Sequence, residues 1–225
     1  MTTVMTPSEA AFLLGSTYVS DINLGNDDTE ATRLEFAVGV AGWTNACVAV
    51  AFAALANEQS IKLAYVEEKK LKFFSSRHVI ATQMGATRYP DASLEGELYR
   101  AIGGKSRAGS GSDSVERVVE HWFGKDVRNP YDTVMAVPSK RLLELGLLKE
   151  IETTPDSGRG KVSTILAGKV KTAKEPDLER ITAQISDMQD CAHMWQQFKS
   201  NNAEVASKIF PDISMAIKVR TKTDS

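Results

Sequence analysis

The sequence predicts a mainly α protein, with a compact helical core around one buried apolar helix and two winged-helix-like β-hairpins. No charged residue occurs between Glu35 and Glu58, and a helix that is apolar on all sides is typical of the interior of a helical core. A β-hairpin pattern follows this run directly. A second helix followed by a second hairpin pattern occurs after residue 130, so the same unit is expected twice.

The first third of the chain is predicted to hold two helices and the first hairpin. Thr6–Glu9 combines a capping hydroxyl with proline in the first turn, which favours the start of a helix. The central helix is expected over Phe36–Asn57. The first hairpin is expected to have strands at Ile61–Val66 and Leu71–Phe74, joined by a charged turn at Glu67–Lys70.

The middle of the chain is predicted to hold three further helices. The first covers Ser93–Ile102, where Ser93 and the acidic residues after it favour a helix start. The Gly/Ser-rich stretch 103–112 is expected to be a mobile loop. The next two helices are expected at Val115–Phe123 and Tyr131–Leu145, and Pro138 predicts a kink in the second.

The second hairpin is expected to have strands at Gly146–Ile151 and Val162–Leu166, around a Pro155–Gly158 turn. Residues 169–176 are expected to form a linker. The chain is then predicted to end in two helices and a frayed tail, at Asp177–Phe198, Asn202–Met215 and 218–225. All of these elements are assigned to a single domain, residues 1–225.

The apolar run Phe36–Asn57 is long enough to cross a bilayer, which takes about 20 apolar residues. However, it consists mostly of Ala, Gly and Val, and it carries Thr44 and Asn45. These residues contribute little to membrane insertion. The sequence therefore favours a buried helix over a membrane span, and it lacks a signal peptide pattern at Met1–Thr6.

No motif of enzyme chemistry or cofactor binding emerges from the residue types and spacings. The histidines His78, His121 and His193 do not stand in a nucleophile or metal-binding pattern. Cys47 and Cys191 occur in separate helical patterns, which favours reduced thiols in the cytoplasm and leaves a bridge between them as the alternative. We therefore expect a protein without catalytic activity, metal or cofactor.

The charge balance favours no single class of partner. A formal net charge of −2 gives no global attraction to nucleic acid or anionic lipid. Arg159 and Lys161 lie on the expected wing of the second hairpin, where they could contact a phosphate backbone. A winged-helix nucleic-acid-binding protein is therefore one alternative, and an oligomeric scaffold without ligand, joined through the C-terminal helices, is another.

Four segments together resemble the Golgi phosphoprotein 3 family. Pro7–Leu14 looks like its acidic-leucine opening helix, and Ala51–Ala56 looks like the end of its central helix. Leu94–Ile102 and Lys140–Leu148 are similar to its later helices, the last ending in a Gly-Leu strand. The resemblance implies a mostly helical fold with surface hairpins. It also implies a non-enzymatic, cytoplasmic adaptor, a peripheral membrane protein that binds phosphatidylinositol 4-phosphate and sorts cargo.

The family's lipid pocket uses a tryptophan and several arginines. This sequence offers four candidate lipid- or phosphate-binding residues, Trp43, Arg88, Arg159 and Lys161. It departs from the family in having no Lys or Arg between Arg33 and Lys62, and in having Met135 about where a pocket arginine is expected. The family's fold is therefore a firmer expectation than its lipid site. Protein partners and a homo-oligomer are further expectations.

Overall fold

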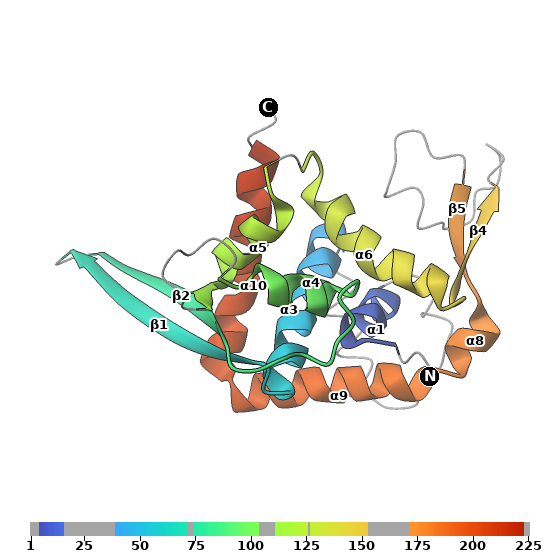
Figure 1. The fold of residues 1–225 in the computed structure, drawn as a ribbon, viewed down its shortest axis with the longest axis horizontal. Helices are drawn as coiled ribbons and strands as arrows, with labels where there is room; N and C mark the ends of the chain where they lie inside the picture. The colour runs from blue at the N-terminus through green and yellow to red at the C-terminus, as the bar shows by residue number, and fades with distance from the viewer. Residues whose placement is uncertain are drawn as a thin grey trace.

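The computed structural model describes residues 5–15, 39–71, 74–103, 111–125, 127–152 and 172–222. These residues are mostly helical, as predicted (Figure 1). The described helices are α1 (Pro7–Leu14), α3 (Gly39–Asn57), α4 (Leu94–Ala101), α5 (Val115–Phe123), α6 (Pro130–Glu144), α8 (Leu178–Thr182), α9 (Ile185–Asn201) and α10 (Ala203–Lys222). The strands are β1 (Ile61–Leu71), β2 (Phe74–Gln83), β3 (Ser112–Ser114), β4 (Leu148–Glu152) and β5 (Thr172–Pro176).

Helix α3 forms the centre of the core. None of the ten residues from Ala46 to Leu55 exposes more than 1% of its surface. Helices α1, α4, α6, α9 and α10 all pack against it, and Figure 1 shows it behind α4 and between α10 and α1. The predicted buried apolar helix is confirmed over its described part. Among the described helices, none combines the length and the apolar content that a membrane crossing needs.

Helix α1 is fixed to two other helices by buried carboxylates. Its predicted start is confirmed, because the N–H of Thr6 donates to Glu9 Oε2 at 2.9 Å in a capping box. Glu9 also pairs with Nε of Arg141 on α6. Glu95 on α4 accepts hydrogen bonds from the backbone N–H and the hydroxyl of Ser8, at 2.7 and 2.9 Å.

The surroundings of Glu95 make it a poor site for a charge. Glu95 and Ser8 are fully buried. Burial raises the pKa of Glu95, and the hydrogen bonds from its own backbone and from Ser8 offset only part of that effect. Burial likewise raises the pKa of Glu9, even though the Arg141 guanidinium acts in the opposite direction.

The first hairpin is present, but its predicted strands are too short. Strands β1 and β2 pair in antiparallel register from Ile61↔Gln83 to Leu71↔Phe74, so the expected turn at Glu67–Lys70 lies within β1. The hairpin projects from the helical body (Figure 1), and Glu67 pairs across the strands with Arg77.

A short third strand extends this sheet to the order β1-β2-β3. The predicted mobile loop 103–112 is wrong at its C-terminal end, where Ser112 belongs to β3 and the Gly111 carbonyl accepts from Gln83 N–H at 2.6 Å. Backbone pairing with β2 holds this end in place. Where β3 ends, Asp212 of α10 accepts from Val79 N–H at 2.8 Å. The carboxylate of Asp212 thus supplies the hydrogen-bond acceptor that a longer β3 would have supplied.

The second helix–hairpin unit is confirmed only in outline. Helix α6 and strand β4 lie where they were expected, but β4 pairs with β5, Thr172–Pro176. The expected linker at 169–176 is therefore wrong over the residues of this strand. The expected partner strand Val162–Leu166 and the turn at Pro155–Gly158 lie outside the described residues. The structure shows a helix followed by a two-stranded ribbon.

The C-terminal helices differ from the prediction at their ends. The expected single helix Asp177–Phe198 is divided into α8 and α9 by a turn at Ala183 and Gln184. Helix α10 continues through Pro211 to Lys222, so residues 218–222 are helical and not frayed. Burial of Ala216 and Ile217 extends the apolar face of α10 beyond the predicted end.

The burial of Glu95 leads to a prediction about stability. Glu95→Ala leaves the N–H and hydroxyl of Ser8 without acceptors, so we expect a loss of about 2–4 kcal/mol of unfolding free energy. Glu95→Gln keeps an acceptor for the N–H and is expected to cost less than about 1 kcal/mol at neutral pH. Urea denaturation measures both. Equal losses for the two variants would contradict this role.

The same pair of variants gives a pH test. Because the pKa of Glu95 is raised in the folded state, its contribution to stability is complete below the pKa of the unfolded chain and is lost as pH rises through the folded pKa. The stability of Glu95→Gln relative to the natural protein should therefore improve from pH 5 to pH 8. A constant difference would show that Glu95 titrates normally.

Candidate functional site

Trp43, the first of the residues predicted from sequence, is part of the core. It is 5% exposed, its Nε1–H donates to the carbonyl of Phe12 at 3.0 Å, and its ring lies 4.8 Å from that of Phe12. A Cβ on Gly15 would lie 2.1 Å from the indole, so only glycine fits there. The indole joins α3 to α1 and offers almost no surface to a lipid headgroup.

Arg88, the second candidate, lies on the surface loop between β2 and α4. Its Nε is 3.0 Å from Oε2 of Glu58, a carboxylate whose side chain is only 7% exposed. Thr87 donates to the other oxygen of Glu58 at 2.5 Å. Arg88 therefore connects this loop to the end of α3 through an ion pair, although its own side chain is 77% exposed. The structure does not bring Arg88 and the buried Trp43 into one site.

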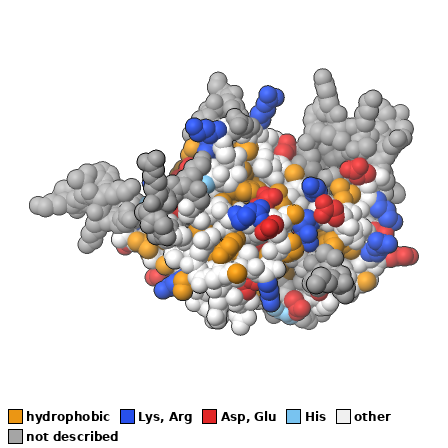
Figure 2. Space-filling model, in the orientation of Figure 1, with side chains coloured by type: hydrophobic (Ala, Val, Ile, Leu, Met, Phe, Trp, Pro, Cys, Tyr) orange, Lys and Arg blue, Asp and Glu red, His pale blue; other side chains and the backbone are white. Residues whose placement is uncertain are grey.

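The remaining two candidates, Arg159 and Lys161, lie outside the described residues. On the described surface, charges of both signs are mixed. Figure 2 shows basic and acidic side chains next to one another on one face, and Arg100 pairs with Asp91 at 2.8 Å. This mixed pattern gives little basis for a strong anion site on that face.

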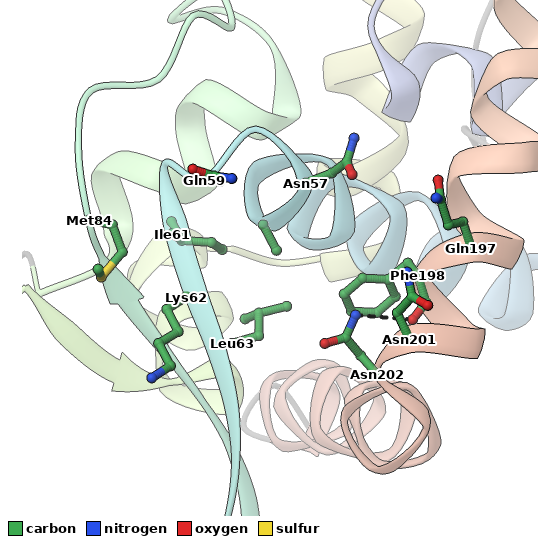
Figure 3. Close-up of a pocket in the computed structure, with 11 residues that line it drawn as sticks. Asn57, Gln59, Ile61, Lys62, Leu63, Met84, Gln197, Phe198, Asn201 and Asn202 are labelled. Atoms are coloured by element: carbon green, nitrogen blue, oxygen red, sulfur yellow. Dashed lines mark hydrogen bonds between the residues drawn. The ribbon is translucent and has the colours of Figure 1, made fainter.

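A different site emerges where α3, β1 and the α9–α10 corner meet. A pocket of about 700 Å³ opens there, within the range typical of ligand sites. Five side-chain amides line it, and we call it the amide pocket (Figure 3): Asn57, Gln59, Gln197, Asn201 and Asn202. Its apolar wall includes Ile61, Leu63 and Phe198, and Figure 3 shows Leu63 between β1 and Phe198.

The chemistry of the amide pocket is that of a binding site. Each carboxamide both donates and accepts hydrogen bonds, and none of them titrates. Asn202 already uses its Nδ2 to donate to the Phe198 carbonyl at 3.2 Å. Lys62 is the one charged residue among the described residues that line the pocket. The pocket therefore suits a polar occupant that is neutral or carries negative charge.

Gln59 gives the pocket its strained corner. It is the one non-glycine residue of the described chain with a positive φ, 62°. Helix α3 ends there because Ser60 N–H donates to Leu55 O and Gln59 N–H to Ala56 O, both at 3.1 Å. These bonds form a Schellman motif, in which the residue with positive φ is usually glycine. Glutamine is less stable than glycine in this backbone conformation, and its side-chain amide lines the pocket.

Sequence reasoning missed this site. Apart from Met84, its residues come from two short segments, 56–63 and 197–202, that are far apart along the chain. Each segment holds amide residues next to a helix end, where they are common for local reasons. The sequence does not predict that these two segments lie side by side, because their proximity depends on the direction of the chain between α9 and α10.

Comparison with known proteins adds no identity: no protein-family model, no curated protein and no solved structure matches this chain.

The strain at Gln59 can be tested directly. Gln59→Gly should stabilise the fold by up to about 1 kcal/mol, because relief of about 1–2 kcal/mol at positive φ exceeds the added freedom of the unfolded chain. Gln59→Ala keeps a Cβ and should give no such gain. Urea denaturation of the two variants measures the difference. A glycine variant less stable than the alanine variant would contradict the strain.

Proposed function

We propose that this chain is a non-enzymatic adaptor that binds a partner in the amide pocket. The observation that carries the proposal is that five side-chain amides, from the ends of α3 and α9 and the turns that follow them, line one opening. Such groups recognise a partner by hydrogen bonds, and the apolar wall behind them supplies contact area. An adaptor role is also what the resemblance to the Golgi phosphoprotein 3 family implies.

A photo-crosslinking experiment tests this proposal. Benzoylphenylalanine placed at Gln197, an exposed pocket residue, should form an adduct with a discrete partner in cells of the natural host. The same group at Lys140, exposed on α6 and outside the pocket, should not. Asn201→Arg should abolish the adduct because it fills the pocket with a large charged side chain, whereas Ser200→Arg should leave it intact. No adduct at 197, or one insensitive to Asn201→Arg, would contradict the proposal.

We propose a separate membrane contact on the segment that carries Arg159 and Lys161. Trp43 is buried and Arg88 is paired with Glu58, so the proposal rests on the two remaining candidates, Arg159 and Lys161. A surface lysine or arginine contributes about 1 kcal/mol to binding an anionic membrane. The contact would hold the adaptor at a phosphoinositide-containing surface, as the resemblance implies.

Vesicle flotation tests the membrane contact. The chain should float with vesicles that contain phosphatidylinositol 4-phosphate, and the variant Arg159→Ala/Lys161→Ala should bind about 30-fold more weakly, as expected for two contacts of that size. Absence of binding to any anionic vesicle would refute the contact. If the variant instead loses a DNA gel shift at low salt and no vesicle binding, the nucleic-acid alternative is favoured.

A further inference from the structure

The amide pocket runs along the edge of a β-sheet. Strand β1 is the outer strand of the order β1-β2-β3, so within the described residues it pairs on one side only. Ile61, Lys62 and Leu63 all line the pocket. Side chains of consecutive strand residues point to opposite faces, so a cavity that touches all three lies along the edge of the strand and not over one face.

On its outer side β1 has no strand partner among the described residues, so its backbone groups there are available for pairing. Along an unpaired strand edge, alternate residues direct both an N–H and a C=O outward. Such an edge is a template for another strand. Sheet edges in other proteins bind extended peptides in this way, with the backbone giving affinity and the side-chain pockets giving specificity.

Two of the amides that line the pocket follow one another along α9 at a spacing close to the repeat of a strand. Gln197 and Asn201 are four residues apart on α9, so their Cβ atoms are about 5–6 Å apart on one helix face. An extended chain repeats its outward backbone groups every two residues, about 6.7 Å. Side-chain amides can both donate and accept, as a peptide bond does. These two residues can therefore satisfy successive peptide groups on the far edge of an inserted strand.

The charge of the residues that line the pocket indicates which charge the bound peptide carries. Lys62 supplies the single charge among its described lining residues. A peptide that carries a carboxylate near this position gains an ion pair and meets no acidic lining residue. The carboxylate can belong to an acidic side chain or to the C-terminus of the peptide, and both sources have the same chemistry.

We propose that the amide pocket binds an extended, carboxylate-bearing peptide of a partner protein, which adds to the edge of β1 as a fourth strand. This inference rests on the proposed adaptor function and names the class of its partner. The peptide lies between two hydrogen-bonding walls, β1 on one side and the amides of α9 on the other. Leu63 and Phe198 contact its apolar side chains.

Panning a library of random ten-residue peptides on the full chain tests the proposal. The recovered peptides should bind Lys62→Glu and Gln197→Ala/Asn201→Ala at least tenfold more weakly than the natural protein. Lys140→Glu and Ser200→Ala are the matched controls and should bind normally. Loss of binding on C-terminal amidation, or on replacement of an acidic residue by its amide, identifies the source of the carboxylate, and either result supports the proposal.

Two further measurements test whether the backbone of the peptide pairs with the backbone of β1. In a synthetic copy of a recovered peptide, N-methylation should weaken binding at least tenfold at the alternate residues that face β1. At the residues between them, which face the side-chain amides of α9, the loss should be smaller. Within residues 61–65, the alternate backbone amides that point away from β2 should exchange hydrogen at least tenfold more slowly when the peptide is bound. Uniform sensitivity to N-methylation, or unchanged exchange in β1, would overturn strand addition.

Failure of this proposal is distinguishable from failure of the adaptor function. If no peptide is recovered, or if the peptides ignore the pocket variants, the peptide assignment is wrong. A crosslink from position 197 to a folded partner, or a glycan-array signal lost in Asn201→Arg, would then preserve the pocket as a binding site with another class of occupant. Absence of both would remove the adaptor function as well.

Discussion

The structure depends on the anchoring of the N-terminal end of α1 by buried carboxylates. Glu9 and Glu95 have no exposed surface, and they bind groups from α1, α6 and the residues that cap α1. Removing a partner from such a pair strands a charge or a donor in the interior, which costs several kcal/mol. A helix of eight residues is too short to be stable alone. These contacts therefore define where α1 lies.

The position of α1 determines how α3 is covered. Phe12 and Leu13 are fully buried, and the Phe12 carbonyl accepts the indole N–H of Trp43. Helices α1, α4, α6, α9 and α10 surround α3 and bury it from Ala46 to Leu55, close to its C-terminal end. There the chain must leave the core. The Schellman turn at Gln59 directs it into β1, and the amide pocket occupies the space beside that exit.

Local patterns predicted the helical elements well because their signals lie within a few residues. Helix α5 matches its expected range, and the capping box of α1 was readable from Thr6–Glu9. The strands of the first hairpin were predicted too short, because the charged residues from Glu67 onward are typical of a turn. Their strand conformation depends on pairing with β2, where Arg77 lies opposite Glu67. Strand β3 and strand β5 are short and depend on partners elsewhere. The burial of Trp43 against Gly15 and Phe12 was not predicted, because it is a tertiary contact that no local pattern indicates.

The amide pocket and the basic residues predicted from sequence imply different physics of binding. Contacts of Arg or Lys with phosphate groups release counterions, so they weaken steeply with salt. Hydrogen bonds between carboxamides and a peptide backbone carry no net charge, and Lys62 contributes a single ion pair. Binding of the proposed peptide in the pocket should therefore depend weakly on salt, while the proposed membrane contact through Arg159 and Lys161 should depend on it strongly. A change in salt concentration would then weaken the proposed membrane contact and leave the proposed peptide bound in the pocket.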